Sequence, residues 1–210
     1  MTLQVIFVSV TMLIITPHTT KLTKIFHFYK TFLVFLNNYM YIYNMIKMIH
    51  KTYRFRIYPN ASQIVLLAKH FGCTRFVYNY FLNQRQEQYR EKGVSDNYYA
   101  QAKMLTELKK QEETAWLKDV NSQTLQFALR NLETAYTNFF QKRAKFPSYH
   151  SKKGKNTFTV PQFATIENGK LWLPKFNSGI TIHLHRGIKG NMGKVSITKT
   201  PTGKYFVSVF

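Results

Sequence analysis

The sequence predicts an α+β protein in which one strand is followed by four helices and then by several antiparallel strands. Apolar residues recur with the helical period between about residues 60 and 140, and with a period of two on either side of that segment. Composition agrees, since 45% of the residues are hydrophobic and 16% are aromatic, which supplies a core despite a formal net charge of +21.

Residues 1–46 are apolar but follow no clear period. Neither of their two apolar runs reaches the roughly 20 uninterrupted residues of a membrane-spanning helix, and Lys30 and two asparagines break the second run. We therefore expect an apolar leader outside the fold, with the authentic start at Met45 or Met48. A membrane anchor and a natural folded extension are the alternatives.

The organised chain begins with a predicted strand over residues 47–58. In the sequence YRFRIY, aromatic and aliphatic residues alternate with arginines, as in a half-buried strand with a basic outer face. Arg54 and Arg56 lie two residues apart on that face, with Lys51 beside them. This spacing fits a track for phosphate groups, and the alternative is that the two arginines only keep the strand soluble.

A helical lobe is predicted over residues 59–144. It starts in a helix-turn-helix-like manner, with a helix to about residue 71, a short turn at Gly72 and a second helix over 74–92. A third helix is expected over 99–113. The fourth starts at Ser122 and has the clearest apolar stripe in the chain. Its opposite face places Ser122, Gln126 and Arg130 one turn apart, where they could read nucleic acid or simply face solvent.

Residues 145–158 are predicted to be a basic linker, and residues 159–210 a strand-rich region with a hairpin turn at Pro201-Thr202-Gly203. The aromatic side chains within the basic stretch favour nucleic-acid binding over simple solubility. The predicted RNA- or phosphate-binding residues in this linker and just before it are Lys142, Arg143, Lys145, Tyr149, Lys152, Lys153 and Lys155.

The charge balance points to a polyanionic partner and away from metal catalysis. The chain has 30 Lys and Arg against 9 Asp and Glu, and eight of the nine acids lie in residues 87–150. A two-metal nuclease site needs several converging carboxylates, which this distribution does not supply. Cys73 is the only cysteine, so neither a disulfide nor a cysteine zinc site is predicted.

Several segments together resemble one protein family. FRIYPNASQ, GCTRFVYNYFLNQR, LKKQEETAWLKDVNSQTLQFALRNLETAYTNFF, KFPSYHSKK and NGKLWLPKF are similar to the N-terminal half of TnpB, the OrfB-type transposon protein described as a transposase with a helix-turn-helix domain. The resemblance extends from about residue 48 to residue 210.

The resemblance implies an RNA-guided DNA endonuclease whose first half is a wedge-type β-barrel with an inserted helical recognition lobe. This half binds guide RNA and reads a short motif beside the DNA target. The second half of the family carries a RuvC nuclease domain that uses magnesium, and a zinc ribbon. Neither is found in this sequence, so we expect a chain truncated at its C-terminus, without catalytic residues or a cofactor of its own. By position, the resemblance places Tyr98, Ser122, Gln126, Thr159 and Gln162 near the target-adjacent DNA motif.

Two hypotheses of different classes follow. The first is a cytoplasmic, prokaryotic nucleic-acid-binding fragment whose partners are guide RNA and DNA, with no small-molecule substrate. The second, less favoured, is a basic protein tethered by residues 1–46 to a membrane and held by anionic lipid.

Overall fold

The computed structural model describes residues 19–46, 51–154 and 156–210, and the chain divides into two compact units, Met1–His50 and Lys51–Phe210. In the first unit, helix α2 (Thr19–Ile46) forms although its apolar residues gather on no single face, and the side chains from residue 25 to residue 40 are all exposed. Among the described residues, no helix has the length and apolarity needed to cross a membrane. The expectation that residues 1–46 lie outside the fold stays a prediction. The first eighteen of these residues lie outside the described ranges.

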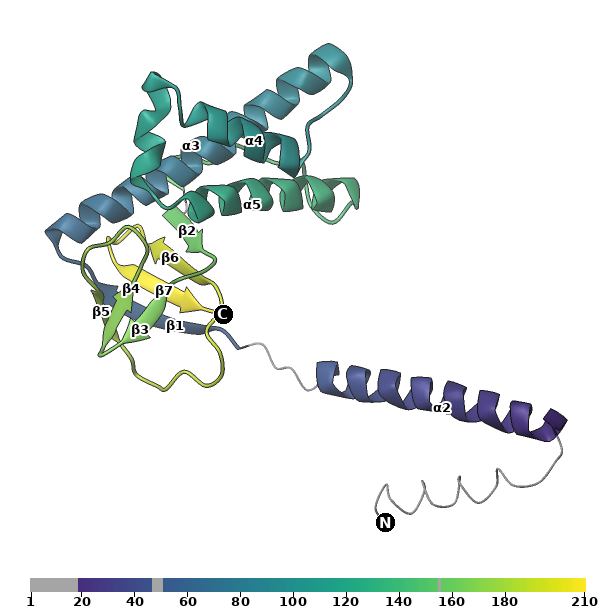
Figure 1. The fold of residues 1–210 in the computed structure, drawn as a ribbon. Helices are drawn as coiled ribbons and strands as arrows, with labels where there is room; N and C mark the ends of the chain where they lie inside the picture. The colour runs from purple at the N-terminus through teal and green to yellow at the C-terminus, as the bar shows by residue number, and fades with distance from the viewer. Residues whose placement is uncertain (1–18, 47–50, 155) are drawn as a thin grey trace. The chain divides into compact units, whose positions relative to one another are not determined.

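The second unit contains one antiparallel sheet of seven strands (Figure 1). Apolar residues at alternate positions, such as Phe55 and Ile57, point into its core, which confirms the period of two seen in the sequence. The first sheet strand after the helices starts at Asn156, inside the stretch expected to be a linker. The strands are β1 (Tyr53–Tyr58), β2 (Asn156–Val160), β3 (Thr165–Glu167), β4 (Lys170–Trp172), β5 (Ile180–His183), β6 (Val195–Lys199) and β7 (Tyr205–Val209), in the order β2-β6-β7-β1-β5-β4-β3.

The connectivity requires this sheet to curl. β2 and β3 lie at its two opposite edges, which in a flat sheet would be about 29 Å apart across six strand spacings. The chain passes from Val160 to Thr165 in five peptide steps, which span at most about 18 Å. The two edges therefore approach each other at this end, and one apolar core is enclosed by all seven strands and the start of a helix. β2 and β3 do not pair, so the described strands form an open sheet.

Helix α3 (Ala61–Lys92) is continuous, so the expected turn at Gly72 is wrong. It starts at a capping box, in which Asn60 Oδ1 accepts a hydrogen bond from the Gln63 backbone N–H and the Gln63 side chain accepts one from the Asn60 N–H. It ends at Gly93, which adopts a left-handed conformation. The residue before Gly72 packs into the sheet core and the residue after it into a second, helical core, so α3 joins two cores without a break.

The helical core is formed by α3 together with three further elements. They are α4 (Tyr98–Leu108), the 3-10 helix η2 (Glu112–Asp119) and α5 (Ser122–Phe140). The predicted third helix therefore ends earlier than expected, and a 3-10 segment follows it. The apolar stripe of α5 is buried as predicted, through Leu125, Ala128, Leu129, Leu132 and Tyr136. Its opposite face is left open along one side of the lobe.

Candidate nucleic-acid interface

A small hollow lies between the open face of α5 and the connection from β2 to β3. Its volume is about 100 Å³. Three predicted DNA-binding residues line it: Gln126 and Arg130 from α5, and Gln162 from a segment more than 30 residues further along the chain. Gln123, Phe127 and Pro161 complete the lining. The structure thus brings half of the predicted DNA-binding residues together.

The start of α5 is fixed by its cap, which sets the direction in which these amides point. The Asn121 side chain accepts a hydrogen bond of 2.8 Å from the Gln123 backbone N–H. The Gln123 side-chain amide donates to Gln162 Oε1 at 3.2 Å and so ties the helix to the strand connection. Sequence analysis missed Gln123 and Phe127, although both border the polar face that Gln126 marks.

Tyr98 and Ser122 lie beside this hollow and contact neighbouring cations. Arg130 Nε donates to the Tyr98 hydroxyl at 3.3 Å, and the guanidinium carbon lies 5.6 Å from the centre of the tyrosine ring. Ser122 Oγ accepts a hydrogen bond of 3.1 Å from Lys109 Nζ. Tyr98 therefore connects α4 to the exposed face of α5.

The structure does not bring Thr159 into the hollow. It lies on β2, and its hydroxyl is buried in a 2.7 Å hydrogen bond with Ser196 Oγ on β6. A direct base contact by Thr159 would have to replace that bond. Its role in DNA binding stays a prediction.

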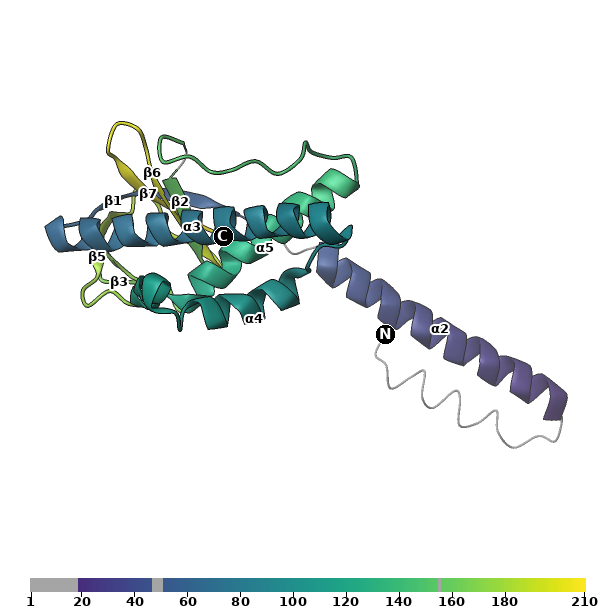
Figure 2. The same cartoon turned by 90° about the horizontal axis from the view of Figure 1, so that it is seen from above.

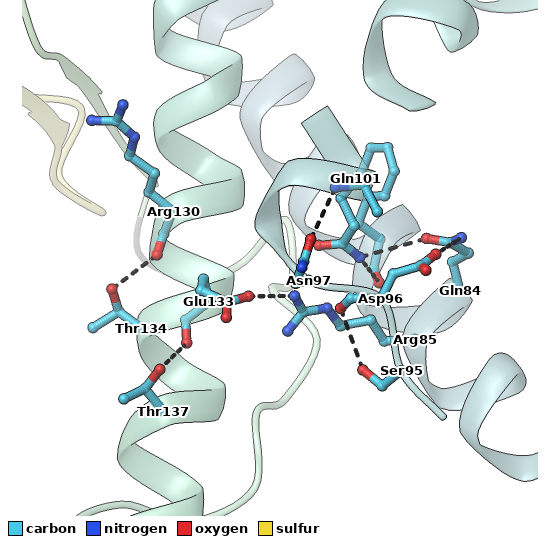
Figure 3. A network of polar contacts seen from close by, with 12 residues as sticks. Gln84, Arg85, Ser95, Asp96, Asn97, Gln101, Arg130, Glu133, Thr134 and Thr137 are labelled. Carbon is cyan, nitrogen blue, oxygen red and sulfur yellow. Dashed lines mark hydrogen bonds and ion pairs between the residues drawn. The ribbon is translucent and has the colours of Figure 1, made fainter. Parts of the chain in front are cut away.

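Polar contacts join α3 to α5 and to the loop that precedes α4 (Figure 3). Arg85 on α3 is only 3% exposed and forms an ion pair with Glu133 on α5, while Asp96 accepts hydrogen bonds from Gln84 and from Gln88. Arg130 points away from this network, toward the hollow's side of the helix. The Arg85–Glu133 pair joins α3 to α5, and Gln126 and Arg130 are exposed on the face of α5 that lines the hollow.

The outer face of the sheet carries the predicted phosphate track. Arg56 lies in one cross-strand row with Phe206 on β7 and His183 on β5, and the guanidinium carbons of Arg54 and Arg56 lie 4.4 and 5.4 Å from the centre of the Phe206 ring. Lys51 is exposed just before β1. The aromatic ring holds both cationic side chains in position, and Arg54 is exposed while Arg56 is half-buried.

The basic stretch after α5 is docked along α3, a feature that its composition did not predict (Figure 2). The Tyr149 hydroxyl lies 3.0 Å from the side-chain oxygens of both Asn83 and Gln86 and donates its one proton to this pair of acceptors. Asn79 forms two hydrogen bonds with the backbone of His150. The predicted cations Lys142, Arg143, Lys145, Lys152 and Lys153 are exposed along it, and Lys155 lies outside the described residues.

Neither a metal centre nor a reactive thiol is found in the described part of the chain. No group of three or more histidine, cysteine, aspartate or glutamate side chains comes together in residues 19–46, 51–154 and 156–210. Burial, with a smaller contribution from Asp119, raises the pKa of Cys73 to about 11, so its thiol stays protonated.

A family model described as a helix-turn-helix domain, that of OrfB proteins, matches residues 45–93. A Streptomyces pristinaespiralis protein named "Putative RNA-guided DNA endonuclease" is 35% identical over 170 residues, and Escherichia coli InsQ, named in the same way, is 32% identical over 161 residues. The chain belongs to the TnpB/OrfB family.

The similarity to these two TnpB/OrfB relatives covers 79% and 76% of this chain but 42% and 40% of their own lengths, so the chain spans about two fifths of each. A third relative, virulence protein VsdF of Salmonella dublin, is 36% identical over 108 residues, which are 47% of this chain and 91% of that protein. The matched helix-turn-helix segment corresponds here to β1 and the continuous helix α3.

Proposed function

We propose that residues 51–210 form a nucleic-acid-recognition part of an RNA-guided DNA endonuclease. The observation that carries the proposal is the meeting of Gln126, Arg130 and Gln162 at one hollow of a strongly basic protein. Side-chain amides both donate and accept hydrogen bonds, and so can pair with an adenine edge in a major groove, while arginine pairs with guanine or phosphate. The hollow would read the DNA motif beside the target.

The size of the hollow supports this assignment over a small-molecule site. A volume of about 100 Å³ is well below the roughly 300 Å³ at which ligand pockets begin. The polar edge of a base pair presented by a duplex needs no deeper cavity, because the rest of the base stays stacked in the DNA.

Guide RNA would be held by the outer sheet face and by the docked basic stretch. Both present exposed cations next to aromatic rings, through Arg54 on the sheet and through Lys152 and Tyr149 in the stretch. Phosphate contacts of this kind dominate affinity without reading sequence. The curled sheet, whose edges approach between β2 and β3, is the part that we assign to the family's wedge-type barrel.

The test is selection of DNA duplexes by the full chain from a library with randomised positions. The unsubstituted protein should enrich a short motif. Gln126→Ala should lose the preference at one or two of its base pairs, weakening binding to the enriched duplex by about 1–3 kcal/mol and leaving other duplexes unchanged. Lys152→Ala is the matched control, and it should weaken all duplexes alike.

A salt titration tests the RNA part of the proposal. If about six to eight phosphates are contacted, the logarithm of the RNA-binding constant, plotted against the logarithm of the salt concentration, should have a slope between about −4 and −7. A slope near zero would contradict the assignment of the basic surfaces to RNA. In the duplex selection, an enriched motif that Gln126→Ala does not change would contradict the assignment of the hollow to DNA.

A further inference from the structure

A second and larger hollow lies away from the α5 face, where α3 passes η2. Its volume is about 330 Å³, and Lys69, Gly72, Cys73, Trp116 and Asp119 line it. This volume is at the lower end of the range in which ligand pockets fall, so a single ring system fits where the first hollow has room only for an edge. None of these residues belongs to the interface described above.

Trp116 forms an aromatic wall that is already held in place. Its indole N–H donates to the Glu113 carbonyl oxygen at 3.0 Å, and its ring packs edge-on against Phe76, with centroids 5.0 Å apart. The side chain is nevertheless 42% exposed. A planar group that stacks on this ring would find it fixed before binding, and so would lose little affinity to ordering it.

Gly72 gives the hollow its flat floor. A Cβ added at this position would meet no atom within 4 Å, and the residue lies in the interior of α3, where glycine is about 1 kcal/mol less favourable than alanine. Packing within the chain therefore does not require the absence of a side chain. A ligand that approaches the helix backbone closely, however, does require a residue without a side chain at this position.

Lys69 and Asp119 supply the polar rim. Lys69 Nζ lies 2.8 Å from Asp119 Oδ2, and each side chain is 48% exposed. The rim thus presents a carboxylate, which accepts two hydrogen bonds, next to an ammonium group, which donates. The Watson–Crick edge of guanine has two neighbouring N–H donors followed by a carbonyl acceptor, whereas adenine has one donor and one acceptor. The rim complements guanine better than any other base.

We propose that this hollow binds an unpaired guanine base, stacked on Trp116 over Gly72 and hydrogen-bonded by Asp119 and Lys69. The proposal rests on the proposed function in that the base comes from a bound nucleic acid. Every neutral aromatic wall stacks all four bases, so the specificity comes from the rim. An exposed base in a loop or at a strand end is the form in which single-stranded nucleic acid offers this edge.

The chain offers its own reporter for the test. It has two tryptophans, so Trp172→Phe leaves Trp116 as the only indole, and stacking of a base should quench its fluorescence. The full chain carrying this substitution is titrated with oligouridylates that contain one central guanosine, adenosine or inosine. We expect about tenfold tighter binding with guanosine than with adenosine. Inosine, which lacks the N2 amino group, should bind with intermediate affinity.

Two substitutions and one control test the residues. Asp119→Asn should abolish the guanosine preference, because an amide offers one acceptor where the carboxylate offers two. Gly72→Ala should reduce guanosine affinity without lowering the melting temperature. Glu113→Gln removes the same charge from η2 outside the hollow and should keep the preference.

Deoxy versions of the same oligonucleotides and free guanosine monophosphate distinguish the sources of the base. Equal quenching by ribo and deoxy forms would show that the base alone is recognised, and quenching by the mononucleotide would show that the strand is dispensable. Equal affinity for guanosine and adenosine, or a preference that survives Asp119→Asn, would overturn this inference alone. Absence of any salt-dependent binding to the oligonucleotides would overturn the proposed function with it.

Discussion

Lowering the pH below about 6.5 should destabilise the second unit through His70, a residue of α3 that is 1% exposed. Its ring lies between Phe158 and Phe176, with centroids 5.0 and 5.3 Å away. Nδ1 donates to the Leu66 carbonyl oxygen at 2.8 Å, and Nε2 accepts from the Asn121 N–H at 3.4 Å. Both ring nitrogens are therefore satisfied in the neutral form, and protonation of Nε2 would place two N–H groups against each other.

The magnitude follows from the difference in proton binding. Burial holds the pKa of His70 below its usual 6.5, against an opposing contribution from the Leu66 hydrogen bond. The unfolded chain thus takes up a proton at a higher pH than the folded protein does. The free energy of unfolding is highest above pH 6.5 and falls as the pH drops toward the folded-state pKa, by at most about 1.4 kcal/mol per pH unit. His150, whose pKa is lowered by burial and by the charge of Arg75, adds a contribution of the same sign.

Urea unfolding between pH 7.5 and pH 5.0 measures this dependence in a range where most carboxylates stay ionised. His70→Asn should lower the free energy of unfolding at pH 7.5 by about 1–3 kcal/mol, because the Asn121 N–H loses its acceptor. It should also flatten the pH dependence. His183→Asn, at an exposed position of β5, controls for the loss of a histidine as such. If His70→Asn loses stability with falling pH as steeply as the unsubstituted protein, the assignment of the effect to His70 is refuted.

Three further predictions concern stability and order. Gly72→Ala should raise the free energy of unfolding by about 0.5–1 kcal/mol, and with it the melting temperature by about 1–4 °C, since nothing obstructs a methyl group in mid-helix. A lower melting temperature would contradict this. Glu133→Ala should lower the free energy of unfolding, measured in urea, by about 2–4 kcal/mol, because it leaves the buried guanidinium of Arg85 without a counter-charge. Glu107→Ala, in an exposed pair, is the control and should lower it by less than about 0.5 kcal/mol. Tyr149→Phe should speed trypsin cleavage within residues 141–154, because it removes the hydroxyl that is hydrogen-bonded to α3. An unchanged cleavage rate would show that this hydroxyl does not hold the stretch.

Features set by local periodicity were predictable from the sequence. The alternation in β1, the apolar stripe of α5 and the hairpin at Pro201-Thr202-Gly203 all appear where expected. The Thr200 N–H closes that hairpin by donating to the Lys204 carbonyl oxygen at 2.8 Å, and Thr200 Oγ1 accepts a hydrogen bond of 3.0 Å from the Lys204 N–H. In β1 and α5 one face of a single element is buried, so the pattern of neighbouring residues carries the information, while the hairpin is marked by its own turn residues.

Features that depend on distant partners were not predictable in this way. Gly72 was taken as a helix end, but two cores on either side of it hold α3 straight and outweigh its low helix propensity. The basic stretch was expected to be a linker, because nothing local marks the docking of Tyr149 and His150 on a helix more than 60 residues earlier. For the candidate site, the sequence supplied Gln126 and Gln162 separately, and only the fold showed that both line one hollow.

The continuity of α3 has a mechanical consequence. A helix of 32 residues is about 48 Å long, and its first half belongs to the sheet core while its second half belongs to the helical core. Because one helix packs into both cores, we expect the sheet and the helical lobe to move and to unfold together. We therefore expect the angle between the sheet and the helical lobe to be fixed by this one helix.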